Sequence, residues 1–265
     1  MASLAQPNLA PSVGDERFFL RSAILMALLV AAAFSFQLAM GRSTFASPVR
    51  VHVHALLFMG WVTIYVLQNI LVSTGRMGLH RRLGWIAAAW AAAMVVSGFI
   101  VTGAMTRAGT VPFFFTPLHF LIFNPTTLLT FAALTAAAIV MRRRTEWHRR
   151  LHLCGMAMLI APAFGRLLPL PLITPFAWEA TFVGGLLFPL AGMWRDLRRE
   201  GRIHRAWVWG VGVMLTAFVL IQAVSSSPLG AAIYDRVTAG SPGASIDPLA
   251  YPLPPAGPLM TGRSE

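Results

Sequence analysis

Histidines beside long apolar segments are the residues of this sequence best suited to chemistry. His54 and His119 each open an apolar stretch, while His80 and His148 each stand directly before two arginines. His80 follows His54 by 26 residues, and His148 follows His119 by 29. An imidazole binds metal ions through a ring nitrogen and exchanges protons near neutral pH. The repeated pattern therefore indicates a metal, cofactor or proton site built from two similar units.

The composition shows which elements must position these histidines. Hydrophobic residues make up 57% of the 265 residues and charged residues only 11%, which is far from the balance of a soluble domain. A membrane-spanning helix needs about 20 mostly apolar residues. We therefore expect an all-α integral membrane helical bundle with seven transmembrane helices. The apolar runs lie at 22–41, 51–75, 83–106, 108–141, 151–172, 174–194 and 206–227.

The distribution of charge predicts the orientation of the chain. A net charge of +12 would suggest nucleic acid as the partner of a soluble domain. Here most arginines lie in the N-terminal segment and in the loops 75–84, 141–150 and 195–205. Basic loops stay in the cytoplasm, so we expect a cytoplasmic N-terminus and a periplasmic C-terminus. The predicted setting is the bilayer of a bacterial inner membrane, with no nucleic acid bound.

The chain divides into a tail, a membrane domain and a second tail. We expect residues 1–16 to form a cytoplasmic tail, 17–227 the seven-helix domain and 228–265 a disordered outer tail rich in Pro, Gly and Ala. Segments 51–106 and 117–170 predict a central four-helix (2+2) parallel repeat, whose halves would be related by an axis along the membrane normal.

Sorting the histidines by side predicts two levels of facing imidazoles. His54 and His119 fall near the outer surface, and His80 and His148 near the inner one. Two facing imidazoles at each level are what two b-type haems need as axial ligands, in an apolar slot between helices. His152 lies one turn from His148 on the same helix face and is an alternative inner ligand. Two stacked haems would carry electrons across the membrane.

The single cysteine and the arginines limit how a haem could be attached and which residues could pair with its propionates. Cys154 is the single cysteine, which excludes a disulfide, a cysteine metal cluster or a thioether haem attachment within one chain. Arginines can pair with haem propionates, Arg166 with outer ones and four other arginines with inner ones. These four are Arg81, Arg82, Arg149 and Arg150.

Arg166 and Glu179 form a second constellation near the outer side. Our default expectation is a salt bridge between their helices across a proline-rich turn. The alternatives are a propionate clamp, or a polar pocket with His52, His54 and His119 that binds a divalent metal or relays protons.

Short motifs around the histidines resemble the cytochrome b-561 family. His54-Ala-Leu-Leu-Phe-Met-Gly60 resembles the opening of one family helix, and Leu79-His80-Arg-Arg-Leu-Gly84 resembles the start of the next. Pro117-Leu118-His119 is similar to the third ligand helix, and His148 falls where the fourth ligand is expected. The resemblance implies the axial pairs His54–His119 and His80–His148.

This likeness covers about residues 51–170, and the chain is also similar to bacterial predicted membrane proteins without an assigned function. We therefore expect a transmembrane b-type haem protein, a possible membrane oxidoreductase whose electron donor and acceptor the sequence does not specify. The alternative is a haem-free multi-pass transporter or accessory subunit that uses the outer His and Glu residues for protons or a metal. In that case the His-Arg-Arg clusters would be membrane anchors.

Overall fold

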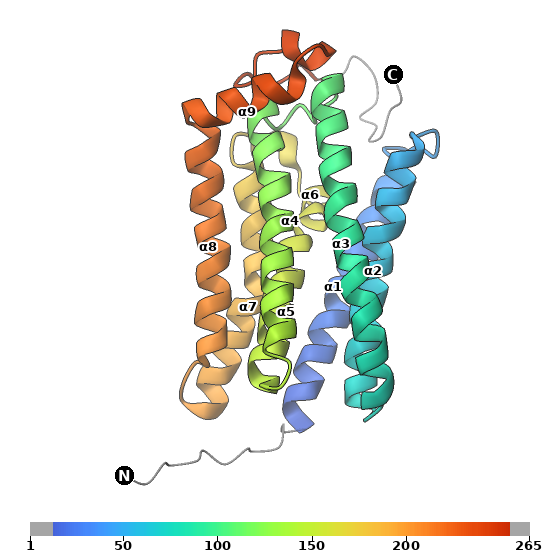
Figure 1. The fold of residues 1–265 in the computed structure, drawn as a ribbon, viewed down its shortest axis with the longest axis vertical. Helices are drawn as coiled ribbons and strands as arrows, with labels where there is room; N and C mark the ends of the chain where they lie inside the picture. Colours follow the sequence, from blue (N-terminus) through green and yellow to red (C-terminus); the bar gives the residue numbers. More distant parts are fainter. Residues whose placement is uncertain (1–12, 255–265) are drawn as a thin grey trace.

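The computed structural model describes residues 13–254 and confirms the all-α fold. Most of its helices run along the long axis of the molecule, and the last lies across one end (Figure 1). The helices are α1 (Val13–Ala39), α2 (Val49–Ser73), α3 (Met77–Ala108), α4 (Pro117–Val140), α5 (Thr145–Leu159), α6 (Ala161–Leu167), α7 (Ala177–Glu200), α8 (Arg205–Ser225) and α9 (Pro228–Thr238). Two short 3-10 helices are η1 (Leu170–Leu172) and η2 (Pro242–Ser245).

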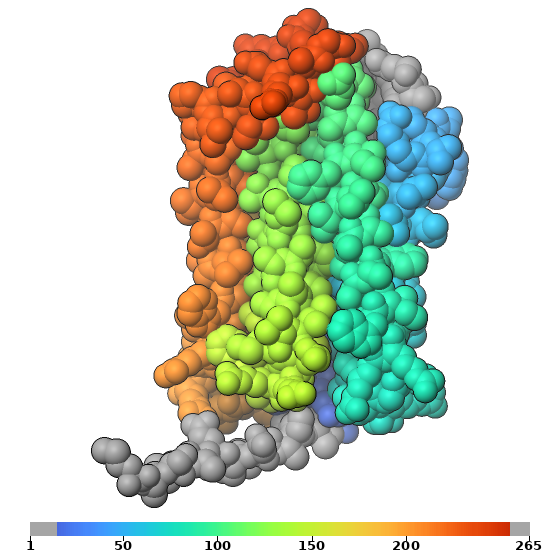
Figure 2. Space-filling model, viewed as in Figure 1, coloured from blue at the N-terminus to red at the C-terminus, as the bar shows by residue number. Residues whose placement is uncertain are grey.

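Five helices of the described chain are long and apolar enough to cross a membrane, namely α1 from Asp15 onward, α2, α3, α4 and α8. Their outward-facing side chains are apolar as well. Leu56, Trp85, Val96 and Val219 are each at least 60% exposed, and extensive exposed apolar surface indicates contact with lipid. Figure 2 shows the helices side by side along one face, closed at one end by α9 and the residues after it. A multi-pass membrane protein fits these observations.

The expectation of seven spans is met only in part, because two of the predicted crossings are divided or charged. The apolar run 151–172 was expected to form one crossing, but the structure ends α5 at Leu159 and begins α6 at Ala161. Pro162 follows at once, and proline cannot donate the backbone hydrogen bond that would continue α5. The crossing formed by α7 ends in a charged segment that includes Asp196 and Glu200. Both nevertheless run beside the five apolar helices (Figure 1).

Pro125 has a different effect on α4, which continues through it as a helix. Asn124 Nδ2 donates to the Phe120 carbonyl at 2.9 Å, and Thr126 Oγ1 donates to the Ile122 carbonyl at 2.8 Å. Side-chain donors of this kind satisfy backbone carbonyls around a proline within a membrane.

Residues 228–254 are ordered in α9, η2 and the segment that follows, in contrast to the disordered tail expected for 228–265. Tyr234 is only 2% exposed and donates its hydroxyl to the Gly243 carbonyl at 2.9 Å. The Leu118 amide at the start of α4 donates to the Pro248 carbonyl at 3.0 Å. These tertiary contacts order a segment with little apolar periodicity of its own. Residues 1–12 and 255–265 of the two predicted tails lie outside the described residues.

The packing of the helices decides which histidines can meet. α2 packs on α3 and α4 packs on α5, as the predicted helix pairs require, and α3 also packs on α4. α7 packs on α5 and α6, while α8 packs on α4 and α5. Trp61 of α2 meets Phe131 of α4 edge-on, with ring centres 5.1 Å apart, but neither α2 and α4 nor α3 and α5 form an extensive interface in the described chain.

Candidate functional site

Three imidazoles gather where α3 and α5 begin, and we call His80, His148 and His152 the histidine triplet. This end of the bundle also carries the α4–α5 and α7–α8 turns, and we call it the basic end. The ring centres of His80 and His148 are 6.2 Å apart, with the ring planes nearly perpendicular. His148 and His152 are 4.7 Å apart. The structure therefore brings together all three residues predicted for the inner level.

The ring nitrogens of the triplet have unequal partners. His148 Nδ1 lies 2.8 Å from the Ala138 carbonyl, which fixes that nitrogen as the donor and leaves Nε2 with a free lone pair. Metal-binding histidines are commonly oriented by such a bond to a backbone carbonyl. His80 Nδ1 is buried without a hydrogen-bond partner in the described structure. A buried nitrogen in this state is costly and points to a missing partner.

The spacing of His80 and His148 agrees with axial ligation of one iron. Fe–N bonds of about 2 Å place facing nitrogens about 4 Å apart and ring centres on the order of 6 Å apart. The two rings meet between α3 and α5, which form no extensive interface in the described chain. The described residues contain no group of three or more His, Cys, Asp or Glu side chains arranged for a metal ion. Two facing imidazoles are the ligand set that a six-coordinate b-type haem iron takes from a protein.

His54 and His119, at the opposite end, have separate surroundings. His54 Nδ1 lies 3.4 Å from Ser97 Oγ of α3, and its ring is 4.2 Å from that of Phe58. His119 faces Trp178 of α7, with ring centres 5.3 Å apart. No contact between the two imidazoles is found in the described structure, although α2 and α4 touch elsewhere through the rings of Trp61 and Phe131. Their assignment as an axial pair stays a prediction.

His119 belongs to a polar cluster of α4, α7 and α8 that also contains Glu179 and Gln222. Gln222 Nε2 donates to Glu179 Oε1 at 2.9 Å. Both His119 Nε2 and Glu179 Oε2 are buried without a partner. Tyr251 lies close to this cluster, where burial and the charge of Glu179 raise the pKa of its phenol. We call His119, Glu179 and Gln222 the outer polar cluster.

The prediction of a salt bridge between Arg166 and Glu179 is wrong. Glu179 bonds to Gln222 of α8 instead, while the Arg166 guanidinium stacks over the Phe34 ring at 4.0 Å and donates to the Pro162 carbonyl at 3.0 Å. Arg166 lies in the short α6, which faces α1 as well as α7. Arg166 is close enough to His54 for its charge to influence that imidazole. This proximity is one that both alternatives for Arg166, a propionate clamp and a polar pocket with His54, require.

Arg149 and Arg150, which were expected to pair with propionates, are already paired with carboxylates. Arg150 Nη2 lies 2.9 Å from Asp196 Oδ2, and both side chains are 1% exposed. Trp207 Nε1 donates to the same carboxylate at 2.9 Å. Arg149 pairs with Asp15 at 2.5 Å, and Glu146 contacts both arginines. Their role is therefore to join α1, α5 and α7.

Only Arg81 and Arg82 remain as exposed cations beside the triplet, with no ion pair in the described chain. Asp196 was not predicted as a functional residue. Its position as a single acid within the basic segment Arg195–Arg199 could have indicated an ion pair. Asp15 was assigned to a tail because it precedes the first apolar run. Gln222 was missed as well, although a glutamine late in an apolar span is itself a signal.

Comparison with protein-family models, curated proteins and solved structures finds no match for this chain.

Proposed function

We propose that the protein is a membrane-embedded b-type haem protein that carries electrons, with His80 and His148 as axial ligands. The 6.2 Å separation of these rings across α3 and α5 is the observation that carries the proposal. Haem iron would supply a reversible one-electron couple. The resemblance of residues 51–170 to the cytochrome b-561 family points to the same chemistry.

The surrounding residues support distinct tasks at this site. The Ala138 carbonyl orients His148 through Nδ1, so Nε2 is the nitrogen available to iron. His152, 4.7 Å from His148, orients that ring or replaces it as the ligand one turn away. Arg81 and Arg82 are exposed beside the triplet and are the free cations suited to propionates.

Electron transfer across the membrane requires a second haem near the α9 end, and His54 and His119 are its proposed ligands. In this extended form, 51–106 and 117–170 are two halves of a parallel repeat, and α5–α6 and α7 complete seven spans. The N-terminus lies in the cytoplasm and the membrane is the bacterial inner membrane. His54 and His119 would each have to leave their present neighbours, Ser97 and Trp178.

A reduced-minus-oxidised spectrum of the purified full-length protein tests this proposal. Protein from haem-replete cells should show the sharp alpha band of a b-type cytochrome. His80→Ala and His148→Ala should each abolish the haem of the basic end, while the matched control His204→Ala, a turn histidine 5.8 Å from Trp147, should not. A haem-to-protein ratio near two, reduced to one by His54→Ala, would support the extended form. Full haem content in both triplet variants would refute the axial pair.

The outer polar cluster favours a second candidate, a haem-free protein that moves protons. His119 Nε2 and Glu179 Oε2 are both buried and unpaired, and imidazole and carboxylate groups within spans are typical of proton relays. The same spectrum separates the candidates, because a colourless preparation from haem-replete cells supports this one and excludes the first.

A further inference from the structure

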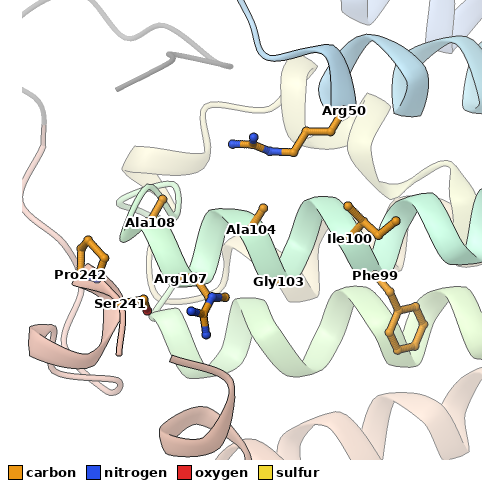
Figure 3. Close-up of a pocket in the computed structure, with 9 residues that line it drawn as sticks. All are labelled: Arg50, Phe99, Ile100, Gly103, Ala104, Arg107, Ala108, Ser241 and Pro242. Atoms are coloured by element: carbon orange, nitrogen blue, oxygen red, sulfur yellow. The ribbon is translucent and has the colours of Figure 1, made fainter. Parts of the chain in front are cut away.

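A groove of about 580 Å³ lies at the α9 end, and no residue of the histidine triplet or of the outer polar cluster lines it. Its floor is the last part of α3, where Gly103, Ala104 and Ala108 leave the helix surface low. Figure 3 shows Arg50 reaching over this surface from α2, with Arg107 on α3 and Ser241 at the η2 side. A Cβ added at Gly103 would meet nothing within 4 Å, so the groove is open at its centre.

The polar part of the groove is positively charged. Arg107 Nη1 donates to the Val237 carbonyl at 2.5 Å and to the Ala239 carbonyl at 3.3 Å, which holds this guanidinium in place. Arg50 is exposed in the first turn of α2, which contains no acidic residue. A cation is unfavourable at a helix N-terminus. Neither arginine forms an ion pair within the described chain, so an anion would complement both.

The other part of the groove is apolar and continues onto the outer surface of a membrane-spanning helix. Phe99 and Ile100 line it and are 41% and 54% exposed. Val96, one turn further along α3, is 60% exposed. A free phosphate would use the arginines and leave this apolar wall uncovered. An amphiphile with an anionic head and a hydrocarbon chain matches both parts.

We propose that this groove is a binding site for one anionic phospholipid, independent of the haem proposal. The phosphate lies between Arg50 and Arg107, which can donate charge-assisted hydrogen bonds to its oxygens. One acyl chain follows α3 past Phe99 and Ile100 into the bilayer. Arg50 and Arg107 would thereby favour an anionic lipid over a neutral one at the surface of α3.

Native mass spectrometry of the full-length protein in a neutral detergent tests the site with phosphatidylglycerol and phosphatidylcholine of identical acyl chains. The wild-type protein should retain one phosphatidylglycerol about tenfold more strongly than phosphatidylcholine, because the choline cation neutralises the phosphatidylcholine headgroup and is repelled by the two arginines. Arg50→Gln should remove most of this preference because it removes one cation. Gly103→Phe should displace both lipids because its ring occupies the centre of the groove.

Two matched control variants test whether lipid binding depends on the groove rather than on any added ring or lost charge. Gly212→Phe also enters open space, but on α8, and Arg236→Gln removes an exposed charge of α9 that does not line the groove. Both should retain phosphatidylglycerol like the wild type. The proposal is overturned if Arg50→Gln and Gly103→Phe also retain it fully, if phosphatidylcholine is retained equally, or if glycerol phosphate displaces the lipid at equal concentration.

Discussion

The two ends of the bundle place histidines at matching levels but use them differently. At the basic end, the rings of His80 and His148 lie 6.2 Å apart although α3 and α5 form no extensive interface in the described chain. At the α9 end, His54 turns to Ser97 of α3, and His119 turns to Trp178 of α7. An equal depth in the membrane therefore does not make two histidines a pair. Their neighbours are decided by the direction in which each helix face points.

Charge is also handled differently at the two ends. The basic end neutralises buried arginines with carboxylates from α1, α5 and α7. The α9 end instead has a glutamate bonded to a neutral glutamine, and there Arg107 and Arg166 donate to backbone carbonyls. The first arrangement joins helices, whereas the second leaves polar groups available to a proton or a ligand.

The largest expected effect comes from breaking the ion pair of the basic end. Asp196→Ala leaves the buried Arg150 with only the partly exposed Glu146 as a carboxylate partner and leaves Trp207 Nε1 without its acceptor, and breaking such a buried pair typically costs about 3–5 kcal/mol. Thermal unfolding in detergent should show this loss, while Glu200→Ala, an exposed acid of the same helix, should change little. Equal unfolding temperatures for the two variants would mean that the pair does not hold α5 to α7.

A smaller effect is expected from loosening the cover of the α9 end. A Cβ at Gly243 would lie 2.2 Å from the Thr106 carbonyl oxygen of α3, so Gly243→Ala must push η2 away at a cost of about 1–3 kcal/mol. Hydrogen exchange should rise in 228–254 and stay unchanged at the basic end. Gly212→Ala, which meets nothing within 4 Å, is the control. Unchanged exchange in 228–254 would show that this contact does not hold the segment.

The smallest effect on stability is expected within the outer polar cluster. Glu179→Gln keeps an oxygen that can accept from Gln222, now at 2.9 Å, so unfolding should shift by no more than about 1 kcal/mol. Proton uptake by proteoliposomes separates the two candidate functions, because its loss in this variant would favour the proton relay. Uptake equal to that of the wild type would remove Glu179 from any such relay.

Apolar run length was sufficient to predict most of the helices. The expected segments 51–75 and 206–227 correspond to α2 (Val49–Ser73) and α8 (Arg205–Ser225), with ends displaced by two residues or fewer. Hydropathy is a local property of about 20 consecutive residues, so sequence alone carries it. The triplet residues could also be named in advance. α3 and α5 are separated by one helix of opposite direction, so the histidines near their starts lie at the same end of the bundle.

The partners of the charged residues could not be predicted from the sequence in the way that the helices were. Arg166 was matched with Glu179 because the two lie close along the chain, but the structure places Arg166 over Phe34 of α1 and Glu179 beside Gln222 of α8. The order in 228–254 likewise depends on Tyr234, Gly243 and Pro248 meeting distant backbone groups.

The order of residue types was sufficient to predict apolar helices with basic turns and with histidines near their ends. The folded bundle was needed to show which imidazoles meet, which carboxylates neutralise Arg149 and Arg150, and where the chain after α8 lies. This difference arises because helix formation and membrane partition depend on residues near in sequence. Side-chain partners depend instead on the rotation and spacing of whole helices, which the packing of the entire bundle sets.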